Sequence, residues 1–129
     1  MATTLEHVRD YLDHESDVSL AYVFGSMAKG SEKYQSDLDV AIQTVAPLSA
    51  PRKMEIIAKL ASIAGRPVDL VDVNQAGEPL LGEILRDGKR LKGSDSQHVA
   101  LIQRHIYNSE DFLPAIRRLL SERRQQWIS

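Results

Sequence analysis

The sequence contains no cysteine among its 129 residues. Disulfides and thiolate zinc sites are therefore excluded, and because a reducing compartment suits such a chain we expect a cytoplasmic protein. Long apolar runs are also missing, since no stretch approaches the roughly 18 residues of a membrane-spanning helix. The N-terminal segment is charged from Glu6 onward and has no apolar region typical of a secretory signal. We expect neither secretion nor membrane insertion.

Aromatic residues are scarce at 5%, but 43% apolar and 26% charged residues are typical of a folded globular protein. A chain of this length holds one modest core, so a single domain over residues 1–129 is expected. The net charge of −2 is unevenly spread, with an excess of acids before residue 86 and of bases after it. Acids interrupt the basic run, which favours a solvated helix or a partner surface over a nucleic-acid-binding arm.

The apolar pattern predicts helices that alternate with short strands. Helices are expected at residues 4–14, 49–65 and 79–88, strands at 18–24, 37–44 and 67–73, and a polar loop at 31–36. A tight turn and a short helix should follow Gly25, and residues 89–93 form either an edge strand or a connector. Residues from about 95 to 128 are helical in pattern, with Pro114 kinking or dividing the helix. This order indicates an α/β or α+β domain with helices against a small mixed sheet.

The helix expected over residues 49–65 has clear boundaries. Pro51 falls in its first turn and Gly65 is its expected stop. Its apolar stripe is predicted to contain Met54, Ile57, Ala58, Leu60 and Ala61.

Asp37 and Asp39 stand two residues apart in the strand expected over residues 37–44. Alternation places both on the face of Ala41, with Leu38, Val40 and Ile42 on the other face. An ionised carboxylate in an apolar interior costs several kcal/mol unless it is paired or bound to a metal. Two carboxylates on one face suit magnesium, which fills its other positions with water and phosphate. The alternative is a surface strand with two solvated acids.

Gly25 and Ser26 follow the first strand directly. Glycine lets the backbone come close to a ligand, a helix start offers unpaired N–H groups, and the serine hydroxyl adds a hydrogen bond. We interpret the turn as a phosphate site. Ser26 as a helix N-cap is an alternative that is compatible with this role.

A third acid is expected from the strand over residues 67–73, which offers Asp69 and Asp72. Alternation places them on opposite faces, so only one can join Asp37 and Asp39. We favour Asp69, because its face carries Val71 and Val73 and because Asp72 lies where the strand gives way to a loop. Alternation alone does not exclude Asp72.

Together, Gly25-Ser26, ten intervening residues, Asp37-Leu38-Asp39 and the later Asp69 resemble the signature of the nucleotidyltransferase superfamily typified by DNA polymerase beta. More narrowly, the chain resembles the minimal nucleotidyltransferase (MNT) antitoxins that are paired with HEPN-domain toxins. The resemblance covers about residues 5–93. It implies a polymerase-beta-like fold with a C-terminal helical extension.

The resemblance also implies roles for individual residues. Gly25 and Ser26 would hold a triphosphate, Asp37 and Asp39 would bind two magnesium ions, and Asp69 would complete the metal site and assist deprotonation of the acceptor. Many relatives have Gly-Ser-Arg-Ala-Arg-Gly at the turn, whereas this chain has Gly-Ser-Met-Ala-Lys-Gly. Lys29 keeps one of the two positive charges and is a candidate phosphate contact.

The implied activity is transfer of AMP from ATP to a hydroxyl, expected on a tyrosine of a HEPN ribonuclease toxin, with release of pyrophosphate and silencing of the toxin. One alternative is an antitoxin that acts only by binding its toxin. Another is a small-molecule nucleotidyltransferase that inactivates antibiotics, although such relatives need extra chain to hold the acceptor. The expected toxin-docking surface is basic and C-terminal, and comprises Lys89, Arg90, Arg117, Arg118, Arg123, Arg124 and Trp127.

The four histidines lack metal-ligand spacing. Arg9 and His14 reproduce the R-x4-H spacing of HEPN ribonucleases. We interpret this as coincidence, because the chain lacks the long helical bundle in which two such motifs meet.

Overall fold

A computed structural model describes residues 2–25, 28, 37–108, 117 and 120–121. The elements with defined bounds are α1 (Thr4–Asp13), β1 (Val18–Phe24), β2 (Leu38–Thr44), α3 (Ala50–Ala64), β3 (Val68–Asp72), the short 3-10 helix η1 (Val73–Gln75), α4 (Leu80–Asp87), β4 (Lys89–Lys92) and α5 (Asp95–Asn108). In these parts of the chain, no helix combines the length and apolar character needed to cross a membrane.

The strands form one mixed sheet with the order β3-β2-β1-β4. β1 pairs antiparallel with both β2 and β4, whereas β2 and β3 are parallel. The expected small mixed sheet is confirmed. Of the two interpretations of residues 89–93, the edge strand is the one found.

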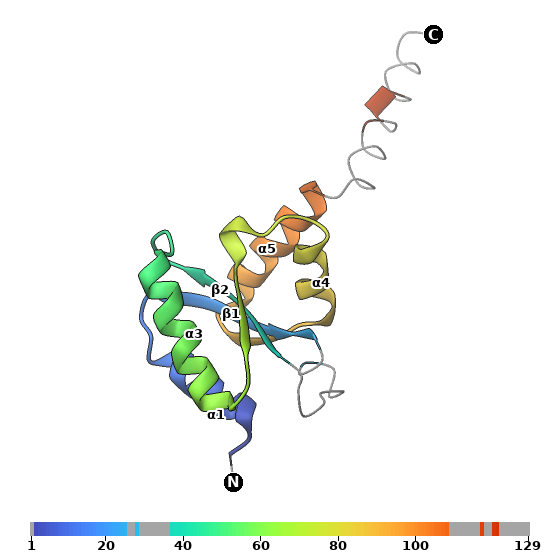
Figure 1. The fold of residues 1–129 in the computed structure, drawn as a ribbon. Coiled ribbons are helices and arrows are strands. Elements are labelled where there is room, and N and C mark those ends of the chain that lie inside the picture. The colour runs from blue at the N-terminus through green and yellow to red at the C-terminus, as the bar shows by residue number, and fades with distance from the viewer. Residues whose placement is uncertain (1, 26–27, 29–36, 109–116, 118–119, 122–129) are drawn as a thin grey trace, which may run out of the picture.

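Helices cover both faces of the sheet, with α1 and α3 on one side and α4 and α5 on the other (Figure 1). One core cluster joins Leu38, Val40 and Ile42 of β2 to α1 and α3. The second cluster joins Ala41 to Leu81 and Ile84 of α4 and to Leu101 of α5. The alternation predicted for β2 is therefore confirmed, and its odd-numbered residues face α4 and α5.

The helix boundaries follow local capping chemistry. Thr3 and Glu6 form a reciprocal capping box at the start of α1, which a Thr-x-x-Glu pattern predicts. The Ser49 side chain accepts a hydrogen bond from Arg52 N at the start of α3. Gly65 ends α3 with a φ of 67°, the left-handed conformation that favours glycine.

The apolar stripe predicted for α3 is wrong in part. Ile56 and Leu60 are fully buried, whereas Met54 is 64% exposed and Ala58 is exposed as well. Apolar residues occur on more than one face of α3, so sequence spacing alone did not identify the buried one. Contact with the sheet selects the i, i+4 pair Ile56 and Leu60.

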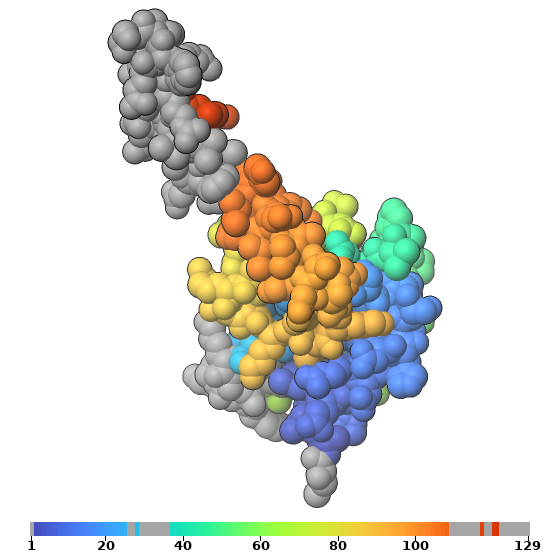
Figure 2. All heavy atoms as spheres, turned by 180° about the vertical axis from the view of Figure 1, so that it is seen from behind, coloured from blue at the N-terminus to red at the C-terminus, as the bar shows by residue number. Residues whose placement is uncertain are grey.

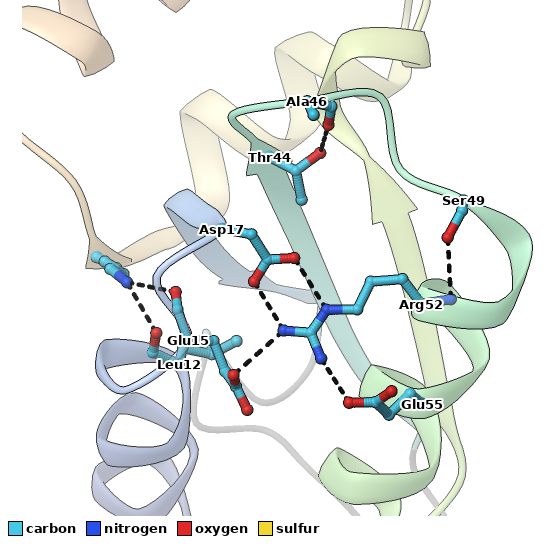
Figure 3. A network of polar contacts seen from close by, with 9 residues as sticks. Leu12, Glu15, Asp17, Thr44, Ala46, Ser49, Arg52 and Glu55 are labelled. Carbon is cyan, nitrogen blue, oxygen red and sulfur yellow. Dashed lines mark hydrogen bonds and ion pairs between the residues drawn. The ribbon is translucent and has the colours of Figure 1, made fainter.

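Arg52 joins the start of α3 to the loop before β1 (Figure 3). Its guanidinium donates from Nε to Asp17 Oδ2 (2.9 Å) and from Nη2 to Asp17 Oδ1 (2.7 Å). The same group contacts Glu15 at 3.2 Å and Glu55 at 2.7 Å. At the other end of this loop, Lys92 Nζ donates to the carbonyl oxygens of Leu12 (2.9 Å) and Glu15 (3.0 Å), so β4 caps the C-terminus of α1.

Some expectations fall outside the described residues. The polar loop at 31–36 does so entirely, as does Pro114 with its expected kink. Of the turn and short helix after β1, Gly25 and Ala28 are described, and Ala28 is buried in the core cluster against α1 and α3.

Candidate active site

Asp39 and Asp69 are neighbours in the sheet. The parallel register of β2 and β3 pairs Asp39 with Asp69, so the two aspartates lie side by side on adjacent strands. Asp39 lies on the same face of the sheet as Ala41, and Asp69 lies on the same face as Val71, because each pair is two residues apart on its strand. Ala41 and Val71 pack in the cluster under α4. Asp39 is half-buried and Asp69 is exposed. The pair lies near the start of β2 and β3, on the side of the sheet that α4 and α5 cover.

Asp37 and Asp72 differ in their relation to this pair. Asp37 is exposed and lies just before β2, two residues from Asp39. Asp72 lies at the far end of β3, where its carboxylate accepts a hydrogen bond from Asn74 N (3.0 Å) and caps η1. The structure thus places Asp69, and not Asp72, beside Asp39.

Gly25 brings the turn after β1 against Asp39. Its φ of 69° is one that L side chains rarely adopt. A Cβ built on Gly25 would also collide with the Asp39 carboxylate, which leaves no space there for a side chain. The Gly25 backbone and the Asp39 carboxylate therefore meet directly. Ser26 and Lys29, the other two predicted residues of this turn, lie outside the described residues.

The pKa of Asp39 is raised above its ordinary value. Burial is the largest cause, followed by the negative charges of Asp69, Asp37 and Glu83. Glu83 belongs to α4 and was not predicted as part of the site. Its position depends on how α4 packs on the sheet, and the sequence around it carries no signal for this. Four carboxylates therefore act on one small region.

This donor set fits magnesium. Among the described residues, no group of three or more acidic, histidine or cysteine side chains is arranged to hold a metal ion. Magnesium does not require such a cage, because it is usually bound by one or two carboxylates together with water and substrate phosphate. The mutual repulsion of Asp37, Asp39 and Asp69 is what a cation with phosphate ligands would relieve.

The histidines make other contacts. His14 Nδ1 lies 2.7 Å from the Asp10 carbonyl of its own helix. His98 Nδ1 lies 2.6 Å from the hydroxyl of buried Tyr22, and His105 Nδ1 lies 2.8 Å from Glu78 Oε1.

A mixed sheet with helices on both faces, and strand carboxylates against a glycine turn, define a nucleotidyltransferase-type fold. Residues 6–97 match the family described as Polymerase beta, Nucleotidyltransferase. The match covers more than half of the chain, and the chain belongs to this family.

Similar proteins agree with this assignment. The protein adenylyltransferase MntA of Shewanella oneidensis is 34% identical over 82 residues, which make up 64% of this chain and 59% of MntA. A chain in the crystal structure of a toxin-antitoxin with AMP-PNP superposes with a TM-score of 0.70 at 27% identity, covering 95% of this chain and 94% of that one. A chain in the crystal structure of the toxin-antitoxin MntA-HepT gives 0.65 at 25% identity, covering 97% and 93%.

Proposed function

We propose that this chain is an antitoxin that transfers AMP from ATP to a hydroxyl, on a tyrosine, of a HEPN-type toxin. The observation that carries the proposal is the meeting of Gly25, Asp39 and Asp69 at one end of strands β1, β2 and β3. The 34% identity to the adenylyltransferase MntA supports the reaction type. The likeness to chains of toxin-antitoxin structures, one with AMP-PNP, supports ATP as the donor and a toxin as the partner.

The chemistry is a displacement at the α-phosphorus of ATP. A bond forms between the acceptor oxygen and the α-phosphorus, and the bond from that phosphorus to the bridging oxygen of pyrophosphate breaks. The acceptor proton passes to a carboxylate, for which we propose exposed Asp69. Backbone N–H groups of the turn at Gly25 and Ser26 hold the triphosphate, with Lys29 as a further contact.

Asp37, Asp39 and Asp69 are the proposed magnesium ligands, with two ions expected from the family resemblance. Bound magnesium supplies charge neutralisation on the triphosphate and lowers the pKa of the acceptor hydroxyl. The chain's own contribution is to place Asp39 and Asp69 on adjacent strands, with Asp39 against Gly25, which carries no side chain.

Two alternatives remain distinct from this proposal. An antitoxin that acts only by binding does not need a half-buried Asp39 whose pKa is raised by burial and by the neighbouring acids at a cost in stability, which favours the enzyme. A small-molecule nucleotidyltransferase would modify an antibiotic in place of a protein. Antibiotic resistance on overexpression would favour that alternative.

The test is incubation of the purified chain with α-labelled ATP, magnesium and the product of the neighbouring gene, which the proposal expects to be a HEPN-domain protein. We expect label on the partner, loss of its ribonuclease activity, and release of pyrophosphate. Asp39→Asn should bind the partner and transfer no label. Silencing of the toxin by Asp39→Asn to the wild-type extent, with no label in either reaction, would establish the binding-only antitoxin instead.

A further inference from the structure

A cleft of about 740 Å³ lies between α4 and α5. Its lining includes Glu78 and Pro79 before α4, Gly82, Glu83 and Arg86 of α4, and His105 of α5. Figure 2 shows α4 (yellow) and α5 (orange) side by side on this face of the molecule. The volume falls within the range of sites that bind compact ligands, which is roughly 300–1,000 Å³.

The cleft is on the same side of the sheet as the strand carboxylates. Asp39 and Asp69 share the parity of Ala41, whose cluster includes α4 and α5. Glu83 connects the two regions, since it lines the cleft and its charge acts on Asp39. Other clefts in the part of the chain that the structure describes lie between α1 and α3 and where β2 and β3 end, and Gly25 lines none of these. A ligand with phosphates at Gly25 can therefore extend toward α4 and α5.

Gly82 and His105 form one wall of the cleft. Gly82 carries no side chain, and a Cβ there would lie 2.7 Å from His105 Cε1, so the imidazole rests against the glycine backbone. Glu78 fixes the ring, because its Oε1 lies 2.8 Å from His105 Nδ1 and its Oε2 accepts a hydrogen bond from Gly82 N at 3.3 Å. Since Glu78 takes Nδ1, the other ring nitrogen, Nε2, is the one that can bond to a ligand. A held imidazole and the Pro79 ring suit an aromatic base.

The charged side chains of the cleft disfavour the phosphates of a nucleotide and favour its base and ribose. Glu78 and Glu83 repel phosphate, but a carboxylate accepts hydrogen bonds from ribose hydroxyls and from an exocyclic amine. Arg86, whose side chain is 73% exposed, supplies donors at the same wall. The polarity thus admits base and ribose and keeps the phosphates at the glycine turn.

We propose that the cleft between α4 and α5 binds the base and ribose of the nucleotide whose phosphates lie at the Gly25 turn. This inference rests on the proposed function, because it concerns the donor nucleotide of that reaction. It assigns to Gly82 and His105 a role in nucleotide binding, while the strand carboxylates carry the chemistry.

The experiment compares two ligands by isothermal titration calorimetry in the presence of magnesium. AMP-PNP has both base and phosphates, whereas inorganic tripolyphosphate has phosphates alone. Gly82→Leu fills the cleft, and His105→Ala removes the imidazole without adding bulk. We expect each variant to weaken AMP-PNP binding about tenfold or more, as the loss of one or two contacts would, and to leave tripolyphosphate binding unchanged.

Ser62→Leu is the matched control, since it places the same bulk in the cleft between α1 and α3 and should bind AMP-PNP as the wild type does. Circular dichroism establishes that each variant is folded. Equal AMP-PNP affinity of wild type, Gly82→Leu and His105→Ala would overturn the inference alone. Normal AMP-PNP binding with lost transfer to the toxin would also overturn it, by assigning the cleft to the acceptor. If the wild-type chain binds no AMP-PNP, both the proposal that it uses ATP and this inference are wrong.

Discussion

At the scale of single residues, Asp39 is the position where the proposed chemistry and the stability of the fold have opposite requirements. Its carboxylate is half-buried, and burial together with Asp69, Asp37 and Glu83 raises its pKa. The ionised form, which a metal requires, is thus the form that the folded protein disfavours in the absence of a ligand. Arrangements that cost stability in this way are typical of functional sites.

We expect Asp39→Asn to raise the melting temperature at pH 7 and to abolish transfer. Because the folded-state pKa of Asp39 lies above the unfolded value of 3.8, the folded chain binds more protons between these values. The free energy of unfolding of the wild type therefore falls as the pH rises through this window. The Asp39→Asn variant does not lose stability in this way, because its amide does not titrate. Thermal unfolding of both proteins without magnesium, at a series of pH values, measures the difference.

The gap in melting temperature should close as the pH falls below 3.8, where Asp39 becomes protonated in both the folded and the unfolded state. Transfer by Asp39→Asn should decrease about 100-fold or more, equivalent to roughly 3 kcal/mol in the barrier. An Asn variant that is less stable than wild type at pH 7 would show that Asp39 makes a stabilising contact in the apo protein.

The two aspartates of β3 should respond differently to substitution. Asp69→Asn removes a charge beside Asp39 and should cripple transfer, again by about 100-fold or more. Asp72→Asn should be nearly neutral for both transfer and stability, because asparagine replaces aspartate well as a cap. Rate measurements with labelled ATP compare them. Reversed outcomes would move the third carboxylate of the site to the other face of β3.

At the scale of the elements, alternation along β2 was sufficient to predict the face of Asp39. A period of two residues fixes which side chains share a face, and the buried face of Leu38, Val40 and Ile42 fixes the direction. The adjacency of Asp39 and Asp69 could not be derived in the same way. It depends on which strands pair and in which register, and no local pattern encodes a contact 30 residues apart.

In the helices, too, local features could be predicted from the sequence, whereas features that depend on tertiary packing could not. The end of α3 was predicted from Gly65, a signal that acts within one turn. The buried face of α3 was not, because apolar residues point in several directions and only contact with the sheet selects among them. Glu83 was missed for this reason too, since the direction of a side chain on α4 is set by packing.

The attachment of α3 to the loop before β1 is testable through Arg52. Arg52→Lys keeps the charge but loses the two-pronged contact with Asp17, and we expect a loss of about 1 kcal/mol in the free energy of unfolding at pH 7. Arg52, chiefly through its hydrogen bond, lowers the pKa of Asp17 below 3.8. The stabilisation is therefore present above that pH and is lost as the pH falls through the folded-state value.

Urea unfolding at pH 7 and at pH 3 measures this contribution. The difference between wild type and Arg52→Lys should shrink at the lower pH. In the background of Asp17→Asn, Arg52→Lys should cost less than it does in the wild type, because the shared contact is already absent. Additive losses at pH 7 would mean that Arg52 stabilises α3 without Asp17.

At the scale of the whole molecule, the two core clusters of the described residues draw their members from the part of the chain up to α5. Leu101 is the last buried residue in either cluster. Beyond Asn108 the chain carries Arg117, Arg118, Arg123, Arg124 and Trp127, most of the expected docking surface. Of its remaining members, Lys89 is exposed, whereas Arg90 is engaged within the chain through Ser94 O (3.0 Å) and Asp95 Oδ1 (2.6 Å). The residues after Asn108 are therefore the ones to test.

A chain truncated after Asn108 should unfold cooperatively and bind AMP-PNP with the wild-type affinity, because it retains the sheet, both clusters and the strand carboxylates. Modification of the toxin should fall about tenfold or more at sub-saturating toxin, since Arg and Trp are favoured interface anchors and positive charge accelerates encounter with an acidic patch. Steady-state labelling at several toxin concentrations measures this loss.

The matched control keeps the full length and replaces Arg117, Arg118, Arg123 and Arg124 with glutamate. If docking is electrostatic, this variant should lose toxin modification as the truncated chain does, and the wild-type rate should fall with added salt while that of the variant should not. A folded truncated chain that modifies the toxin at the wild-type rate would contradict the prediction. The docking surface would then be sought at residues 32–36, the polar loop that precedes Asp37 in the sequence and is the next candidate for a surface beside the carboxylates.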